Sequence, residues 1–404
     1  LLFKFKAHRI YSINWRFKMK TKIFSEPFIK DFFSNNFGKN YLHQKQILPN
    51  SEDVMSLDIL NKMLSIRSNW NNRNFKMILD RQPISYSNYS SLILEHSIEV
   101  LRPDVDKVQN WISKGSSLIL NEIEKLTNNL HDTVNDLQEL TNGKCQGNLY
   151  FSMQSRQAFG PHCDDHDVFA IHFEGEKVWN IYENIEKNPI NHPMFKYSAE
   201  EREKKAGKII DKVTLQPGDL LYLPRGQYHD ALASKNGAIH IAFGLTYFKP
   251  IDLLSLLWEK FIVNEYMRQD IEKNITTENL KDSLKKMSLE ISTIINNQQN
   301  INLASQCIKN WPYSFKDFSL REIMSKGRSY SVQKSINIEK NGNDIFISNG
   351  KDKVLIPNKY IEITKFILNH ELIFEEDVLN NFEHLPKELV LECITNLHKM
   401  KVIT

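Results

Sequence analysis

The stretch PHCDDHDVF, residues 161–169, is the most informative part of this chain. His162 and Asp164 are two residues apart, and in a β-strand side chains at that spacing point to the same face. An imidazole and a carboxylate would therefore project together, while Asp165 would face the other way. One such pair is a weak signal by itself, because triplets of this kind arise by chance on polar surfaces.

A second stretch, QPGDLLYLPRGQYHDA at residues 216–231, supplies a third candidate side chain. Glycine and proline residues predict two turns around a short buried strand at Leu220–Leu223, and His229 follows on a returning strand. The spacing of Gly218, Pro224, Gly226 and His229 resembles the second motif of cupin barrels.

Two such strands on opposite walls of a barrel would bring His229 to His162 and Asp164. Two histidines and one carboxylate on one face of a metal form the facial triad of non-haem iron(II) oxygenases, which leaves the other positions open. The sequence thus predicts an iron(II) site at which a cosubstrate takes two positions and O2 takes the last. His166 and His172 could also be ligands, but no motif supports either. His166 is kept as an alternative ligand because it follows Asp164 by two residues.

The expected cosubstrate is 2-oxoglutarate, whose distal carboxylate must be paired inside an apolar barrel because a buried unpaired charge is very costly. Lys177, in the run EGEKVWNIY, is the candidate cation, with a solvated strand lysine as the alternative. Asn148 and Tyr150 could add hydrogen bonds from the preceding strand, or be ordinary polar residues of the barrel. His240 lies in an apolar run and is interpreted as a core histidine or as one that supports the site from behind, and Cys163 as a packing residue.

These motifs resemble those of a known family, the JmjC-type cupin domain of the ribosomal oxygenases. Members show, in order, N-x-Y, F-x-P-H-x-D-D, E-G-x-K-x-W and L-P-x-G-x-x-H, and this chain carries all four, at residues 148–150, 159–165, 174–179 and 223–229. The resemblance implies three iron ligands, His162, Asp164 and His229. It also implies three contacts to 2-oxoglutarate, Lys177, Asn148 and Tyr150.

The pattern around the motifs predicts an α+β chain of four parts. Residues 1–23 are expected to be a non-native or disordered leader, since they are basic and residue 1 is not Met. Residues 24–250 are expected to hold helices and strands followed by a double-stranded β-helix, the cupin or JmjC jelly roll. Residues 251–310 show apolar positions at helical spacing, and by resemblance form a dimerisation region. Residues 311–404 are predicted to be a winged-helix-like domain.

Three local patterns sharpen these expectations. Leu57–Leu64 and Val108–Leu130 carry apolar residues at helical spacing, but Gly115 in the second run could begin a turn that feeds a short buried strand. The polar stretch Lys187–Asp211 is expected to be a loop or a short helix over the barrel mouth. The tail is predicted to contain strands at 336–347 and 353–356 and helices at 359–369, 375–382 and 386–399.

Composition limits the classes of protein to consider. The net charge of +3 is too small to indicate nucleic-acid or membrane binding, and no apolar run approaches the ~20 residues that cross a bilayer. Acidic residues outnumber basic ones in the tail helices, which favours contact with protein over direct binding of nucleic acid. The four cysteines lie far apart, which argues against a disulfide framework or a zinc site and fits the cytoplasm.

The resemblance therefore implies a 2-oxoglutarate-dependent hydroxylase of a protein or peptide side chain, an Arg or His of a ribosomal protein, working as a homodimer. Three alternatives remain open: a hydroxylase of a ribosomally made natural-product precursor peptide, a lysine demethylase, and a metal-binding cupin without oxidative activity. Met153–Arg156 replaces the Pro/Asn-rich turn of the family beside the expected substrate channel. The motifs consequently do not identify the substrate.

Overall fold

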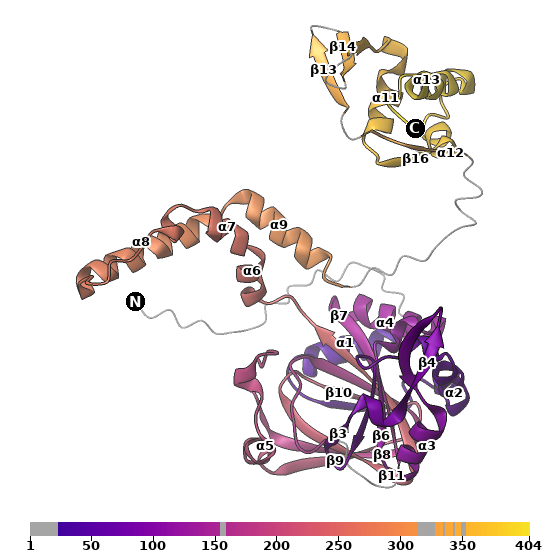
Figure 1. The fold of residues 1–404 in the computed structure, drawn as a ribbon, viewed down its shortest axis with the longest axis vertical. Helices are drawn as coiled ribbons and strands as arrows, with labels where there is room; N and C mark the ends of the chain where they lie inside the picture. The colour runs from indigo at the N-terminus through magenta and orange to yellow at the C-terminus, as the bar shows by residue number, and fades with distance from the viewer. Residues whose placement is uncertain (1–22, 154–158, 313–327, 334–335, 342–343, 349–352) are drawn as a thin grey trace. The chain divides into compact units, whose positions relative to one another are not determined.

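The computed structural model describes residues 23–153, 159–312, 328–333, 336–341, 344–348 and 353–404 (Figure 1). The expected leader at residues 1–23 thus lies almost wholly outside the described residues. The chain divides into two compact units, Leu1–Ser314 and Phe315–Thr404, and each is described by itself. Among the described residues, none of the helices has the length and apolar character that crossing a membrane requires.

The first unit begins with helix α1 (Glu26–Asn35), whose aromatic side chains pack onto the barrel. The hydroxyl of Ser25 accepts a hydrogen bond from the first turn of the helix. Phe32 is fully buried, and its ring meets Phe169 and Tyr222 at centroid distances of 5.6 and 4.8 Å. The next elements are β1 (Leu42–Gln44), α2 (Leu57–Ser65), β2 (Phe75–Leu79), β3 (Gln82–Ile84), β4 (Ser90–Glu95), β5 (Ile98–Pro103), α3 (Val105–Ser113), β6 (Ser117–Asn121) and α4 (Asn128–Thr141).

The run at 108–130 illustrates how a turn residue overrides helical spacing. Helix α3 ends at Ser113, Gly115 takes a φ of +91°, and β6 follows as a buried strand. A left-handed φ is accessible to glycine at little cost, so the helix can stop there and reverse into the sheet. The turn-and-strand alternative is therefore the correct one, and a continuous helix is wrong.

The main sheet has nine strands in the order β1-β10-β8-β11-β7-β6-β2-β3, with β9 paired to β8. Its central strands curve around a common interior (Figure 1), which confirms the cupin fold class. They are β7 (Lys144–Ser152), β8 (Asp167–Ile185), β9 (Ile209–Leu215), β10 (Leu220–Leu223) and β11 (Gln227–Thr246).

Strand β8 is longer than its sequence suggests. The runs DVFAIHF and KVWNIY could each be read as a separate strand, but they are the two halves of β8, and Lys177 lies in the second half. The strand bends at Gly175, which has a φ of +68°, and a Cβ there would collide with the carbonyl oxygen of Gly237 on β11. The polar stretch at 187–211 contains a short helix, α5 (Ala199–Ala206). The stretch ends earlier than expected, because β9 begins at Ile209.

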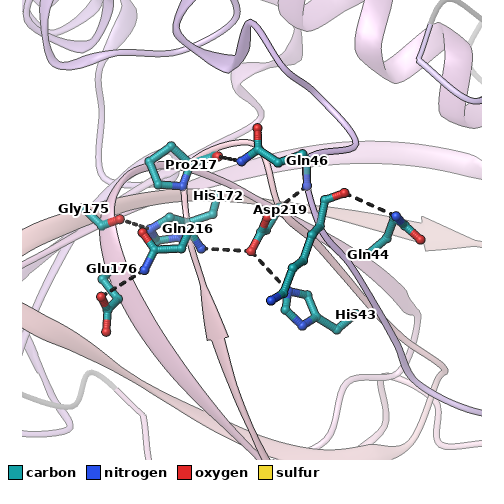
Figure 2. A network of polar contacts seen from close by, with 10 residues as sticks. His43, Gln44, Gln46, His172, Gly175, Glu176, Gln216, Pro217 and Asp219 are labelled. Carbon is teal, nitrogen blue, oxygen red and sulfur yellow. Dashed lines mark hydrogen bonds and ion pairs between the residues drawn. The ribbon is translucent and has the colours of Figure 1, made fainter.

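A buried carboxylate ties the N-terminal segment to the barrel (Figure 2). Asp219, 2% exposed, accepts hydrogen bonds from the backbone N–H groups of Gln46 at 3.0 Å and Gln216 at 3.2 Å. Its Oδ2 also lies 3.1 Å from His43 Nε2. The adjacent backbone pairs with His172, since His172 N–H donates to the carbonyl of Asp219. The Asp219 side chain thus joins β1 and the residues after it to the turn before β10, and its backbone carbonyl joins that turn to β8.

Replacing Asp219 by alanine should lower the free energy of unfolding by about 3 kcal/mol, because several donors lose their acceptor in a buried place. Glu176→Ala is the matched control, since Glu176 accepts from the Gln216 side chain at an exposed position and should cost less than about 0.5 kcal/mol. Urea unfolding followed by far-UV circular dichroism measures both. Equal losses in the two variants would contradict a structural role for the Asp219 network.

After the barrel come four helices: α6 (Pro250–Leu256), α7 (Trp258–Val263), α8 (Thr277–Ile295) and α9 (Gln298–Lys309). Their boundaries agree with the predicted helical run. Large apolar side chains remain on the surface, among them Trp258 (61% exposed), Val263 (71%) and Leu289 (68%). After the last helix, Trp311 Nε1 donates a hydrogen bond to the carbonyl of Thr246 at the end of β11.

The second unit has its own apolar core, formed by residues such as Ile363, Ile367 and Ile394. Strands β13-β14-β15 form one small sheet, and β12 pairs with β16 in another. The predicted helices and the strand at 353–356 are present, but the run at 336–347 contains two antiparallel strands, β13 and β14, and β12 and β16 were not predicted. The elements are β12 (Ser329–Ser331), β13 (Asn337–Asn341), β14 (Asp344–Ser348), β15 (Lys353–Leu355), α11 (Ile361–Leu368), β16 (Leu372–Phe374), α12 (Glu375–Asn381) and α13 (Lys387–Lys399).

Candidate metal and cosubstrate site

The three predicted ligand residues lie together. One ligand atom from each of His162, Asp164 and His229 can be chosen so that all lie within 4.8 Å of one another. The two imidazole rings are 4.5 Å apart, and His229 Nε2 lies 3.6 Å from Asp164 Oδ2. A group of this kind has the composition and the spacing of a metal site.

The local backbone differs from the expected strand. His162 forms a single bridge with His229, in which each backbone N–H donates to the other's carbonyl at 3.0 and 2.8 Å. Asp164 follows in an irregular segment before β8 begins at Asp167. The i, i+2 spacing therefore predicts the correct grouping, but the assumption of a regular strand is wrong.

Backbone carbonyls orient both imidazoles. His162 Nδ1 lies 2.9 Å from the carbonyl oxygen of Gly160, and His229 Nδ1 lies 2.9 Å from that of Gln227. A carbonyl only accepts, so each Nδ1 must carry the proton and donate it. Each Nε2 is then left with a lone pair for a metal, which is the usual arrangement of a ligating histidine.

The pKa shifts of His229 and Asp164 favour the protonation states in which these side chains can bind a metal. Burial, followed by the nearby His162, lowers the pKa of His229 to about 4, so His229 is neutral at pH 7. Burial alone would raise the pKa of Asp164, but His166, His229 and His162 together lower it, which keeps the carboxylate ionised. His166 lines the same cavity, yet its Nδ1 lies 2.8 Å from Asp165 and it is not part of the three-residue group.

The cavity, about 530 Å³, also contains the three predicted cosubstrate residues. Lys177 is 6% exposed, and burial lowers its pKa to about 7. Its Nζ lies 3.3 Å from His240 Nδ1, and among the described residues no carboxylate pairs with it. Asn148 and Tyr150 from β7 line the same space, and the Tyr150 ring stacks on His240 at 4.8 Å. A buried cation without a counter-ion is a place for an anionic ligand.

Comparison with known proteins agrees with this geometry. A family model for the JmjC domain matches residues 121–253. The bifunctional lysine-specific demethylase and histidyl-hydroxylase NO66 of Dictyostelium discoideum is 28% identical over 228 residues, which cover 54% of this chain and 41% of that protein. Ribosomal oxygenase 2 of Bos taurus is 38% identical over 84 residues, or 21% of this chain and 17% of that protein. Residues 121–253 thus match the JmjC domain, and over this part the chain is similar to ribosomal oxygenases.

Solved structures share the cupin fold of the JmjC domain. The structure of ycfD from E. coli has a TM-score of 0.52 at 16% identity and covers 96% of this chain and 100% of that one. The Escherichia coli ribosomal oxygenase YcfD in complex with cobalt and 2-oxoglutarate gives 0.51 at the same identity, covering 93% and 97%. At this identity the likeness shows the fold alone. The chain spans less than half the length of the curated relatives named above.

Several residues of the JmjC domain's cavity were not predicted as site residues. Trp179 packs between two histidines, with its ring 5.7 Å from His229 and 5.3 Å from His240. It is two residues from Lys177, so strand alternation could have identified it. Cys163 packs against the cluster of Tyr182, Ala206 and Tyr228 as expected, but it also lines the cavity. Arg202 and Lys196, in the segment that contains α5, line it too. In Met153–Arg156, only Met153 is among the described residues.

Gly226 holds the turn that carries His229 against the rest of the metal group. Its φ is +90°, its N–H donates to the carbonyl of Asp164 at 3.0 Å, and a Cβ would collide with the carbonyl oxygen of Glu186. Gly237, within β11, has a similar φ of +92°, but a Cβ there would meet nothing closer than 3.5 Å. Substitutions at the two positions therefore separate the energetic cost of backbone strain from the cost of a steric collision.

We expect Gly226→Ala to cost about 3 kcal/mol or more of folding free energy, because collision adds to the ~1–3 kcal/mol of a left-handed non-glycine residue. The same variant should weaken metal binding, since the Asp164 loop moves away from His229. Gly237→Ala should show the strain alone and bind metal normally. Chemical unfolding and metal titration by calorimetry measure the two effects. Indistinguishable variants would show that the Gly226 turn does not position the site.

Proposed function

We propose that this chain is an iron(II)- and 2-oxoglutarate-dependent oxygenase that hydroxylates a side chain of a protein or peptide. The observation that carries the proposal is the presence, in one cavity, of a histidine–histidine–aspartate group and an unpaired buried lysine. Metal binding alone would explain the first feature but not the second. The family relationship supports the same reading.

The residues present fit the proposed metal and cosubstrate. The donor set of His162, Asp164 and His229 is the facial triad typical of non-haem iron(II), and both histidines are held with Nε2 available. When bound, iron and 2-oxoglutarate supply the activation of O2 that inserts one oxygen atom into a C–H bond. Lys177 would neutralise the distal carboxylate of the cosubstrate, with Asn148 and Tyr150 as hydrogen-bonding partners.

The remaining side chains would orient the reactants and exclude water. Trp179 covers the face of His229, and Val168, Ala231 and Ala242 give the cavity an apolar wall. A dry wall strengthens the pairing between Lys177 and a carboxylate, because charges interact more strongly at low dielectric.

The substrate class comes from the named relatives. One is called a lysine-specific demethylase and histidyl-hydroxylase, and others are called ribosomal oxygenases. We infer that the substrate here is an Arg or His side chain of a protein, with a ribosomal protein as the first candidate. Demethylation would use the same oxidation on an N-methyl carbon and would release formaldehyde.

Product analysis separates these outcomes. The purified chain is incubated with iron(II), 2-oxoglutarate and candidate ribosomal proteins, and intact masses and formaldehyde are measured together. The proposal predicts addition of one oxygen atom to a protein, matched by succinate, without formaldehyde. Formaldehyde with loss of a methyl group would instead identify a demethylase. Succinate formation without any change in protein mass would exclude the tested proteins as substrates.

The flanking parts have proposed roles as well. Exposed apolar side chains on the helices at 250–309 support a homodimer formed through this region. The helices and small sheets of the second unit support a winged-helix-like domain that contacts protein. The four cysteines are free, which supports a reducing compartment, and we propose the cytoplasm.

A further inference from the structure

One positively charged side chain of helix α5 faces the cavity, and it differs from the other charged residues of the helix in having no partner of opposite charge among the described residues. Each of its other charged side chains has a partner in the structure: Glu200 with Lys204, Glu201 with the backbone N–H of Ser198, Glu203 with Arg81, and Lys205 with Glu186 and the ring of Tyr197. Arg202 differs, because it lines the cavity that contains the metal group. Its Nε is buried and has no hydrogen-bond partner, and among the described residues no carboxylate pairs with its guanidinium.

This arrangement is held in place by the helix itself. Ser198 and Glu201 form a capping box at the start of α5, and the buried Ala206 packs near its end against Tyr182 and Tyr228. The capping box at one end of the helix and the packing of Ala206 at the other therefore hold Arg202 in its orientation towards the cavity. A buried guanidinium N–H without an acceptor is rare in a native structure and calls for a ligand.

The charges in the cavity indicate the sign of that ligand. Among the described lining residues, Asp164 is the one carboxylate, whereas Lys177, Lys196 and Arg202 are cations. A divalent metal and Lys177 would be balanced by Asp164 and the two negative charges of 2-oxoglutarate. Lys196, which is exposed, and Arg202, whose buried Nε has no acceptor, are then left in excess, so a negative charge on the substrate would balance Arg202.

We propose, building on the proposed function, that Arg202 with Lys196 binds a carboxylate of the substrate close to the residue that is oxidised. The chain would thus select an Arg or His that has an Asp or Glu nearby in the bound segment. A guanidinium suits this task because its planar fork of N–H donors matches a carboxylate. Uniformly basic segments would be rejected, since Arg202 and Lys196 repel a positively charged substrate side chain.

Peptide selection tests this without relying on turnover. Full-length protein is immobilised and exposed to a pool of short synthetic peptides with a central Arg or His and randomised flanks, and retained peptides are identified by mass spectrometry. The variants are Arg202→Gln, Arg202→Lys and Arg202→Glu. Lys204→Gln is the matched control, because it removes the same charge from the same helix at a position that is 77% exposed. Circular dichroism verifies folding.

The wild type should retain peptides enriched in Asp or Glu at one or two fixed positions. Arg202→Gln should weaken the binding of such a peptide about tenfold or more, as expected for loss of a charge-assisted hydrogen bond. Arg202→Lys should keep part of the preference, Arg202→Glu should shift it to Lys or Arg, and Lys204→Gln should behave like the wild type.

The proposal is overturned if the wild type shows no acidic preference, or if Arg202→Gln loses no more of it than Lys204→Gln. It is also overturned if Arg202→Gln leaves peptide selection intact and instead raises the 2-oxoglutarate concentration needed for succinate formation, because Arg202 would then serve the cosubstrate. Absence of succinate from the wild type would reject the proposed function, whereas the peptide selection is read independently of it.

Discussion

Asp164→Asn is expected to abolish metal-dependent turnover of 2-oxoglutarate while leaving the fold intact. The amide keeps the size of the carboxylate but removes the negative charge that the metal requires. Changes to residues that only orient ligands already cost about 10–100-fold in metal affinity or activity, so loss of a ligand should cost at least about 100-fold. Succinate release and metal titration by calorimetry measure the loss.

Asp165→Asn is the control for that experiment. Asp165 is the adjacent carboxylate, but it pairs with His166 at 2.8 Å and is not part of the metal group. It should retain metal affinity within a fewfold of the wild type. If the two variants lost metal equally, the ligand assignment based on the structure would be wrong.

Lys177→Met should raise the 2-oxoglutarate concentration for half-maximal turnover by about 100-fold or more, because a buried charge pair is lost from the cosubstrate side. The same variant should stabilise the protein when no ligand is bound. Burial lowers the pKa of Lys177 from 10.5 to about 7, so folding opposes protonation of this side chain. By linkage, a shift of this size corresponds to a penalty on the order of 5 kcal/mol.

The pH dependence of that penalty has a definite sign. Below about pH 7 the full penalty applies, because the unfolded chain holds the proton freely and the folded chain holds it at a cost. Between about pH 7 and 10.5 the unfolded chain binds more protons than the folded one, so wild-type stability rises with pH. The gain in folding stability of Lys177→Met over the wild type should consequently be largest at pH 7 or below and should vanish above pH 10.5. Urea unfolding at several pH values measures it.

Lys212→Met provides the comparison, since Lys212 is an exposed lysine on the neighbouring strand β9. It should change neither the 2-oxoglutarate requirement nor the pH dependence of stability. A Lys177→Met variant that binds 2-oxoglutarate normally, or that is destabilised at neutral pH, would show that Lys177 is a structural residue.

Short-range spacing explains why the site residues were predictable. His162 and Asp164 lie two residues apart, and His229 follows a turn whose glycine and proline are visible in the sequence. Although His162 is not in a regular strand, its single bridge to His229 produces the same grouping. Lys177 could be found because its apolar neighbours mark it as a strand residue inside a barrel.

Other features depend on tertiary packing and could not be predicted from short stretches of sequence. Strands β8 and β11 are long, and the sequence around Gly175 does not show whether a glycine there ends a strand or, as in β8, bends it. Arg202 lies in a helix that is charged on all sides, so the sequence does not show which cation faces inward. The capping box at Ser198 and the packing of Ala206 against Tyr182 and Tyr228 determine that orientation.

The most direct test of the account is anaerobic reconstitution with iron(II) and 2-oxoglutarate, followed by exposure to oxygen and measurement of succinate, in the wild type, His162→Ala and Lys177→Ala. The account predicts succinate that requires both iron and oxygen in the wild type and is absent from His162→Ala and Lys177→Ala. Absence of both succinate and 2-oxoglutarate binding in the wild type, even with ribosomal protein or peptide extracts added, would contradict it and favour a metal-binding cupin without oxidative activity.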